Sequence, residues 1–257
     1  GTRLPDVLEQ YEIDPVRVPL AAARRAAMAA YLELHIEQGA ELERAGLAVG
    51  IVTGIVGVSN WRVGVDGIAN HAGATRPEDR HDALIPVAKL ALAAQRVMRA
   101  HPGLVATVGE AGVVGGASNI VPGRARCTLD VRSLDDAVLE QAVTEILSAA
   151  ERAADDNGCT LRPQEVKRMP PAEMAPVAMD AFDDAARAEG IAAMRVPSRA
   201  AHDGMNIAHA GVPVGMVFVR SQAGVSHAPA EFSSEDDSEA GARVLARGAI
   251  ELVRRFA

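Results

Sequence analysis

The sequence predicts an α/β protein in which one block of strands and helices is inserted into another. Along both ends of the chain, helical stretches alternate with apolar strand-like runs, as in an α/β layer. From about residue 54 to residue 168 the pattern becomes richer in strands. The stretch Met169–Pro176 then contains three prolines, which is typical of a linker that returns the chain to the first layer. We therefore divide the chain into residues 1–53, 54–168 and 169–257.

The first part is expected to hold short helices and one strand. Pro19 is a favoured helix-opening residue and precedes an alanine-rich stretch, and Gly46 is placed to end a helix. Strict alternation in Tyr31–Ile36 predicts a strand that places His35 on its polar face. The expected helices are Leu4–Leu8, Leu20–Ala30 and Ala40–Ala45.

The middle part has the order strand, helix, strand, strand, helix, strand. This βαββαβ order is the split βαβ, or ferredoxin-like, plan. The expected strands are Ile51–Val58 with Trp61–Asp66, Leu104–Val113, Arg124–Arg132 and Thr160–Val166, and the expected helices are Ala83–Ala100 and Asp135–Ala154. This block is predicted to be an inserted domain.

The last part is expected to contain three helices and one buried strand. The continuous apolar run Pro213–Arg220 predicts a fully buried strand. Ser233 or Ser234, followed by acidic residues, predicts the N-cap of a final helix that reaches Arg255. The two other helices are expected at Asp180–Glu189, before Gly190, and at Met205–Ala210, before Gly211.

Composition limits the classes of function. The 257 residues are 49% hydrophobic and 23% charged, which is enough to bury a core. A formal net charge of -8, without any block of Lys and Arg, argues against a nucleic-acid partner. The apolar runs are too short to cross a membrane, and no signal segment opens the sequence. We expect a soluble cytoplasmic protein, and because the first residue is Gly1, a chain that starts inside a longer reading frame.

The two cysteines, Cys127 and Cys159, form no recognisable pairing or metal motif. Their spacing fits neither a disulfide framework nor Cys-x-x-Cys. We expect both to be free thiols in a reducing compartment.

Two distant histidines suggest a metal site. His35 lies in His-Ile-Glu-Gln-Gly at a predicted strand end, and His227 lies in Gly-x-Ser-His-x-Pro-x-Glu far downstream. Imidazole is a common ligand of divalent transition metals, and ligands from distant segments can converge in a fold. Two histidines are too few for a hydrolytic metal site, so we expect the chain to hold only part of one.

Several ordered motifs resemble the amidase branch of the two-metal aminoacylase and carboxypeptidase clan, which includes N-carbamoyl-L-amino acid hydrolases, allantoate amidohydrolases and ureidopropionases. The resemblance covers nearly the whole chain. The segments that carry it are His-Ile-Glu-Gln-Gly (35–39), Asn-His-Ala-Gly-Ala-Thr (70–75), Asn-Ile-Val-Pro-Gly with Leu-Asp-Val-Arg (119–132), His-Asp (202–203) and Ser-His-Ala-Pro-Ala-Glu (226–231).

The resemblance implies a two-metal hydrolase with an inserted lid and dimerisation domain. His35 would bind one divalent ion and His227 the other, the ions being Zn, Mn, Co or Ni. The bridging aspartate, the remaining glutamate ligand and the general base belong to motifs expected upstream of Gly1. The implied reaction is hydrolysis of the linear C–N bond of an N-carbamoyl-L-amino acid, allantoate or ureidopropionate.

The resemblance also implies roles for five further residues. His71, reaching across a homodimer interface, would stabilise the oxyanion as a catalytic residue. Asn119 and Arg132 would hold the substrate carboxylate, since an amide and a guanidinium fork suit that task. Gln38 would contact the ureido group, and Asn60 would contact the substrate. Three of them also have a plain structural alternative: a turn residue for His71 and Gln38, and an ion pair at a strand end for Arg132.

Departures from the family pattern bear on specificity. The segment Ser-Arg-Ala-Ala-His-Asp has Arg199 and Ala201 where glycines are usual, so close backbone approach to an anionic substrate is in question. Two other functions stay open: a non-catalytic dimerising or ligand-binding module, and an aminoacylase or peptidase of the same clan. The sequence selects neither the particular acid nor the metal.

Overall fold

The protein is a mixed α/β structure that divides into two compact units. The computed structural model describes residues 2–256. The first unit comprises Gly1–Thr53, Met174–Ser198 and His202–Ala257, and the second comprises Gly54–Glu173 and Arg199–Ala201. Each unit has its own sheet and its own hydrophobic core.

The first unit contains strands from both ends of the chain. Its strands are β1 (Tyr31–Ile36), β2 (Val49–Ile55), β11 (Ala193–Ser198) and β12 (Val214–Val219). Its helices are α1 (Leu4–Gln10), η1 (Pro15–Ala27), α2 (Glu41–Ala45), α5 (Pro176–Ala188), α6 (Asp203–His209), η3 (Gln222–Gly224) and α7 (Glu235–Phe256). The strand expected over Pro213–Arg220 is confirmed by β12, in which every residue is buried.

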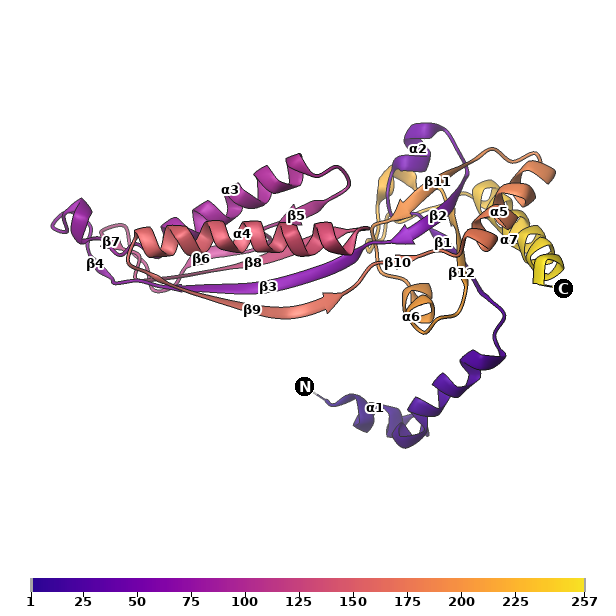
Figure 1. The fold of residues 1–257 in the computed structure, drawn as a ribbon, viewed down its shortest axis with the longest axis horizontal. Helices are drawn as coiled ribbons and strands as arrows, with labels where there is room; N and C mark the ends of the chain where they lie inside the picture. Colours follow the sequence, from indigo (N-terminus) through magenta and orange to yellow (C-terminus); the bar gives the residue numbers. More distant parts are fainter. Residues whose placement is uncertain (1, 257) are drawn as a thin grey trace. The chain divides into compact units, whose positions relative to one another are not determined.

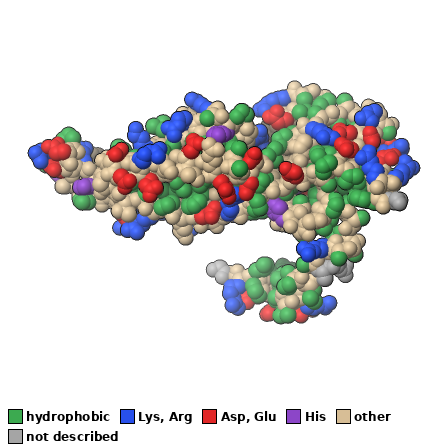
Figure 2. All heavy atoms as spheres, viewed as in Figure 1, with side chains coloured by type: hydrophobic (Ala, Val, Ile, Leu, Met, Phe, Trp, Pro, Cys, Tyr) green, Lys and Arg blue, Asp and Glu red, His purple; other side chains and the backbone are tan. Residues whose placement is uncertain are grey.

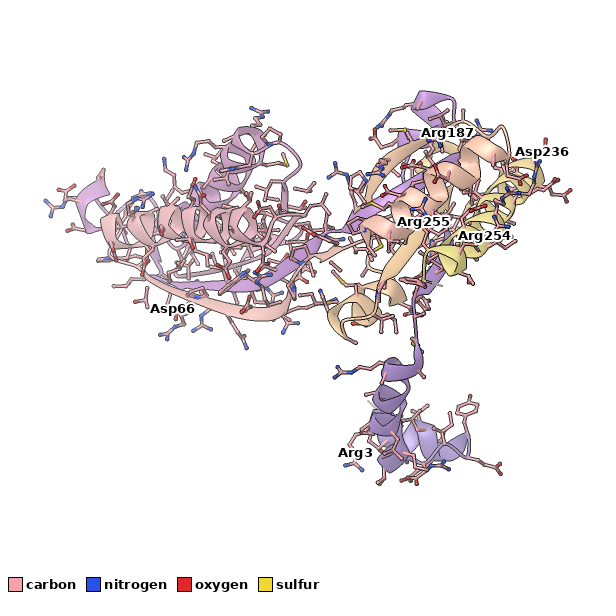
Figure 3. The ribbon with its side chains drawn as sticks, turned by 45° about the vertical axis from the view of Figure 1, so that its right-hand side comes forward. Arg3, Asp66, Arg187, Asp236, Arg254 and Arg255 are labelled. Atoms are coloured by element: carbon pink, nitrogen blue, oxygen red, sulfur yellow. The ribbon has the colours of Figure 1, made fainter. Side chains whose placement is uncertain are left out.

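Strand β12 lies between β1 and β2. It pairs in parallel with β1, so that His35 is in register with Phe218, and it pairs antiparallel with β2. Strand β11 also pairs with β2, as does β10 (Ala172–Glu173). Helices α5 and α7 pack on this sheet, where Phe182, Val217 and Val244 share one core cluster. Figure 3 labels Arg187 on α5 and Arg255 on α7; both hydrogen-bond to Asp184.

The predicted caps of this unit agree with the structure. Gly46 ends α2 in the left-handed conformation, with φ of 67°. The Ser234 hydroxyl accepts a hydrogen bond from the Asp237 N–H at 3.1 Å, which makes Ser234 the cap of α7. The prediction for Leu20–Ala30 was wrong, because this stretch is a 3-10 helix over Pro15–Ala27. Pro15 opens that helix and the Asp14 carboxylate caps it, so Pro19 lies inside.

The second unit is built around a long antiparallel sheet. Its strands are β3 (Gly57–Asp66), β4 (Asn70–His71), β5 (Val105–Thr107), β6 (Ala111–Val113), β7 (Ile120–Val121), β8 (Arg124–Ser133), β9 (Thr160–Met169) and β10. Its helices are η2 (Pro77–Asp79), α3 (Leu84–Ala100) and α4 (Asp136–Asp156).

The sheet order is β5-β8-β3-β9, with β6 also paired to β8. Helices α3 and α4 lie side by side over one face of the sheet (Figure 1). Alternate residues of β3 and β8, such as Val63, Val65, Cys127 and Leu129, point into the core beneath these helices. Their even-numbered neighbours therefore lie on the opposite, open face.

The strand predicted over Leu104–Val113 is interrupted. Thr107 is in register with Asp130, whereas Ala111 is in register with Cys127, so the pairing shifts by one residue around Gly109. The prediction also missed β11, the two-stranded ribbon of β4 and β7, and β10, which lies inside the predicted linker.

No helix of the described residues is long and apolar enough to cross a membrane. Both cysteines are free thiols, as predicted, and both are buried. Burial raises the pKa of Cys127 to about 11. In the view of Figure 2, acidic and basic side chains are interspersed over the surface of the second unit, so no single sign dominates that face.

Candidate functional site

A group of potential metal ligands lies at one edge of the first unit. Glu33 and His35 extend from the same face of β1, and His202 directly precedes α6. One ligand atom from each of the three side chains lies within 4.8 Å of the others. The rings of His35 and His202 meet edge to face, with centroids 4.5 Å apart. The pairing of β1 with β12, together with the position of α6, brings these residues together.

Hydrogen bonds orient each of the three side chains. Glu33 Oε2 accepts from the Gly204 N–H at 3.0 Å, which leaves Oε1 facing His202 Nδ1 at 3.9 Å. His35 Nδ1 lies 2.9 Å from the Ile36 carbonyl oxygen. Because a carbonyl can only accept, Nδ1 carries the proton and Nε2 presents its lone pair. His202 Nε2 lies 2.7 Å from the Ser198 hydroxyl.

His202 is held as a neutral imidazole. Its side chain is 1% exposed, and burial, followed by the electrostatic effect of His35, lowers its pKa from 6.5 to about 4, against a smaller opposing effect of Asp203. A neutral imidazole keeps a lone pair available for a metal. One carboxylate with two imidazoles is a donor set that suits Zn²⁺ and similar divalent ions, so the residues present fit such an ion.

The predicted residues Gln38 and His227 lie against each other. Gln38 Nε2 is 3.3 Å from His227 Nε2 and 2.9 Å from the Ser226 hydroxyl. Both Gln38 and His227 have positive φ, 55° and 57°. This conformation is uncommon for residues other than glycine, and it persists only where the surrounding structure holds it. The Glu231 carboxylate accepts the His227 N–H at 2.9 Å, and this bond is the main cause of its lowered pKa.

His227 is not a member of the ligand group around His35. Among the described residues, the side chains whose ligand atoms lie within 4.8 Å of those of His35 are Glu33 and His202. The charges of His227 and His35 both lower the pKa of Glu231, so Glu231 is influenced by both histidines. The role of His227 as a second metal ligand stays a prediction.

In the second unit, His71 lies in the two-stranded ribbon of β4 and β7, and Asn119 directly precedes β7. His71 pairs with Ile120, and the Asn119 carbonyl accepts from the Ala72 N–H at 2.8 Å. His71 Nδ1 accepts hydrogen bonds from the Gly73 and Ala74 N–H groups, each at 3.1 Å. The proton therefore lies on Nε2, which makes the exposed end of the ring a hydrogen-bond donor.

Asn60 and Arg132 meet at a shared carboxylate. Asp130 accepts from Arg132 Nε at 2.8 Å and Nη2 at 3.1 Å, and from Asn60 Nδ2 at 2.7 Å. Arg132 Nη1 also donates to the Arg199 carbonyl at 3.1 Å. Arg132, Asp130 and Arg199 line a pocket of about 440 Å³ with Val56, Val105 and Thr107. Hydrogen bonding to Asp130 raises the pKa of Arg132, so its charge is secure.

The two residues predicted to hold one carboxylate, Asn119 and Arg132, lie far apart within the chain. Asn119 lies before Arg124, where β8 begins, and Arg132 lies near the end of β8. With a strand rise of about 3.3 Å per residue, the eight steps from Arg124 to Arg132 span roughly 26 Å. One chain therefore presents His71 with Asn119 at one end of β8, and Asn60 with Arg132 at the other.

Sequence reasoning did not assign roles to Glu33, Asp130 or His202. The alternation that placed His35 on the polar face of its strand placed Glu33 there too, and this was the available signal. Asp130 precedes Arg132 by two residues in a strand, so the two share a face. His202 was noted only as part of the His-Asp motif, because its proximity to His35 depends on tertiary structure.

Comparisons with known proteins agree with one another. The sequence pattern of peptidase family M20/M25/M40 matches residues 9–251. The N-carbamoyl-L-amino acid amidohydrolase of Geobacillus stearothermophilus is 40% identical over 95% of this chain and 60% of its own length. The corresponding enzyme of Paenarthrobacter aurescens is 38% identical over 96% and 60%. An amidase of the hydantoinase/carbamoylase family from Burkholderia multivorans matches with a TM-score of 0.80 and 33% identity, over 86% of this chain and 54% of that structure.

The chain thus spans about 60% of the length of these two sequence relatives.

Proposed function

Because the chain belongs to peptidase family M20/M25/M40, we propose that it forms part of a metal-dependent amidohydrolase that acts on ureido acids. The proposed reaction is hydrolysis of the linear carbamoyl C–N bond of an N-carbamoyl-L-amino acid, the substrate class in the names of two relatives. Allantoate and ureidopropionate are the related substrates to compare. The matching relatives are longer than this chain, so the activity is proposed for the whole protein.

The group of Glu33, His35 and His202 supports this proposal most directly. We propose that two divalent ions, among Zn, Mn, Co and Ni, bind the whole protein. His35 would hold one ion, with Glu33 and His202 in reach, and His227 would hold the other. A bound divalent ion would polarise the ureido carbonyl and make water a stronger nucleophile at neutral pH.

The other site residues would bind and orient the substrate. The Gln38 amide, which is hydrogen-bonded to Ser226 and lies next to His227, would contact the ureido group. The Arg132 guanidinium, held by Asp130, would bind the carboxylate, and Asn60 would contact the substrate beside it. His71 would donate from Nε2 to the developing oxyanion, an effect worth a few kcal/mol in other enzymes.

The distance along β8 makes a homodimer part of the proposal. Asn119 is tied to the His71 ribbon, whereas Arg132 lies at the other end of the strand. If both ends serve one substrate, then two copies of the chain supply them. We propose that the second unit, with its ferredoxin-like order of strands and helices, forms that dimer and covers the site as a lid. Asn119 would then reach the substrate carboxylate together with His71 from the partner subunit.

Ammonia release from N-carbamoyl-L-amino acids tests the function. The protein is produced with the coding sequence immediately upstream of Gly1 and assayed with and without a chelator. We expect chelation, His35→Ala and His227→Ala each to lower kcat/KM by at least 100-fold. His101→Ala, directly after α3 in the second unit, is the control. Full activity of either ligand variant would contradict the mechanism.

A substrate panel separates the proposal from its alternatives. Faster turnover of N-acyl amino acids or peptides than of ureido acids would favour an aminoacylase or peptidase of the same clan. A protein that binds no metal and hydrolyses neither class would favour a non-catalytic dimerising or ligand-binding module.

A further inference from the structure

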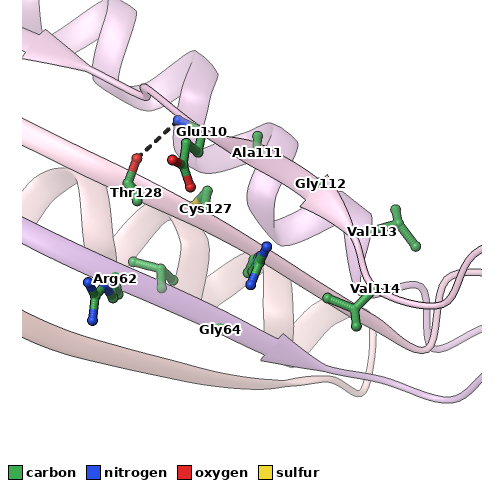
Figure 4. Close-up of a pocket in the computed structure, with 11 residues that line it drawn as sticks. Arg62, Gly64, Glu110, Ala111, Gly112, Val113, Val114, Cys127 and Thr128 are labelled. Atoms are coloured by element: carbon green, nitrogen blue, oxygen red, sulfur yellow. Dashed lines mark hydrogen bonds between the residues drawn. The ribbon is translucent and has the colours of Figure 1, made fainter. Parts of the chain in front are cut away.

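A second pocket lies on the open face of the sheet in the second unit. It has a volume of about 870 Å³ and is lined by residues of β3, β8 and β6. Helices α3 and α4 pack against the opposite face, where Val63 and Cys127 are buried. Figure 4 shows Arg62 and Gly64 on one strand of this pocket and Thr128 on the next, with Glu110 beyond Thr128. The proposed function uses none of these residues.

Strand register arranges the pocket in two rows. In the first row, Arg62 is opposite Thr128. The backbone N–H of Glu110 donates to the Thr128 hydroxyl oxygen, and the N to Oγ1 distance is 3.0 Å. In the second row, Arg126 of β8 is opposite Gly64 of β3 and also opposite Gly112 of β6. Arg62 and Arg126 are therefore diagonal neighbours on one face, a separation of about 7–8 Å between their strand positions.

Among the described residues, Arg62 and Arg126 form no ion pair, whereas neighbouring arginines on the same face do. On the same face, Arg124 and Arg162 both bond to Asp66, labelled in Figure 3, and Arg132 bonds to Asp130. Within residues 2–256, the hydrogen bonds and ion pairs include none from the Arg62 or Arg126 side chain. Two like charges at neighbouring positions of a sheet are unfavourable unless an anion lies between them.

Glycine keeps the floor of the pocket bare. Neither Gly64 nor Gly112 has a positive φ, so the backbone does not require glycine at these positions. A Cβ at Gly112 would meet nothing within 4 Å, and one at Gly64 would meet only Arg162 atoms, at 3.9 Å or more. Packing therefore does not require glycine either. Glycine inside a strand often marks a place where a ligand approaches the backbone closely.

We propose that this pocket binds the phosphate group of a small molecule between Arg62 and Arg126. Two guanidinium groups supply the charge and the paired donors that a dianionic oxyanion needs. The Thr128 oxygen accepts from Glu110, so its hydroxyl hydrogen is free to donate to the same oxyanion. Glu110 and Arg62 flank Thr128 on opposite sides, with about 10 Å between their backbone positions.

Titration with inorganic phosphate tests the site. The chain is treated with a chelator beforehand, so that phosphate cannot bind through a metal ion, and binding is followed by calorimetry at constant ionic strength with chloride as the replaced anion. We expect saturable binding of one phosphate per chain. Arg62→Gln and Arg126→Gln should each raise Kd at least tenfold, and Gly112→Val, which fills the floor without removing charge, should do the same.

Arg124→Gln is the matched control, since Asp66 already pairs with that guanidinium on the same face, and it should change Kd less than twofold. Circular dichroism of each variant checks folding, and Gly112→Val keeps the test valid if an arginine variant does not fold. Three results would overturn the proposal: no saturable binding, a Kd in Arg126→Gln and Gly112→Val that equals the wild-type Kd, or acetate binding as tightly as phosphate. None of them depends on whether the protein hydrolyses ureido acids.

Discussion

The imidazole rings of His35 and His202 meet edge to face with centroids 4.5 Å apart, although one lies on β1 and the other directly before α6. Glu33 completes the group, because its carboxylate is bonded to the Gly204 N–H and turned toward His202. A tertiary contact of this kind places three donors of the types that divalent metals prefer around one point.

Removal of one donor should weaken metal binding by the chain. We expect Glu33→Gln, His35→Ala and His202→Ala each to raise the Kd for Zn²⁺ at least tenfold, because each removes one of three ligand atoms that lie within 4.8 Å of one another. Equilibrium dialysis with metal analysis measures the change, and His101→Ala should leave Kd unaltered. Equal affinity in the wild-type chain and in His35→Ala would show that the ion binds elsewhere.

Acid should destabilise the metal-free protein through His202. Its pKa is lowered from 6.5 to about 4 by burial and by His35, so the unfolded chain binds a proton that the folded chain does not bind between these values. The free energy of unfolding should therefore fall as the pH drops from about 6.5 to 4, by on the order of 2–3 kcal/mol. Urea titrations of the chelated protein, followed by circular dichroism, measure it.

The variant His202→Gln should lose this part of the pH dependence, whereas His101→Gln should keep it. Proton NMR gives a second measurement, since the His202 ring signals should titrate near pH 4. A titration of these signals near 6.5 would contradict the lowered pKa of His202.

Much of the fold could be predicted because its strongest signals are local. The apolar run of β12 and the long amphipathic helices α3 and α4 appear directly in the sequence. Strand β11 could not be predicted in this way, because Arg195 and Pro197 interrupt its pattern and its assignment depends on pairing with β2. The break between β5 and β6 was also missed, since a bulge shifts register without changing composition.

Only those site residues that lie in the ordered sequence motifs could be predicted. The motifs identified the family correctly, as the match over residues 9–251 confirms. They selected His35 but not its neighbours, because the contact between β1 and the segment before α6 is not encoded by spacing. They also associated Asn119 with Arg132. The structure shows that the length of β8 keeps these two residues apart in one chain.

Asp130 should govern how well Arg132 binds a carboxylate. The aspartate grips the guanidinium through two hydrogen bonds, of 2.8 and 3.1 Å, and so fixes its direction. We expect Asp130→Asn to raise KM for N-carbamoyl amino acids about tenfold with a smaller change in kcat, because the arginine keeps its charge but loses its orientation. Steady-state kinetics of the whole protein measures this, and Thr107→Ser, in the same pocket, is the control. A change confined to kcat would contradict a positioning role.

Gly248 of α7 should not tolerate a side chain, although alanine normally favours a helix by about 1 kcal/mol over glycine. An added Cβ would overlap the ring of Phe182, which α5 holds in the core. We therefore expect Gly248→Ala to lower the free energy of unfolding by about 1–3 kcal/mol, the usual cost of overpacking. Urea unfolding followed by circular dichroism measures this change, because the fluorescence of the single tryptophan, Trp61, would report on the other unit. In a Phe182→Leu background the same substitution should cost less, because the smaller side chain makes room for the methyl group. An equal cost in both backgrounds would locate the strain elsewhere on α7.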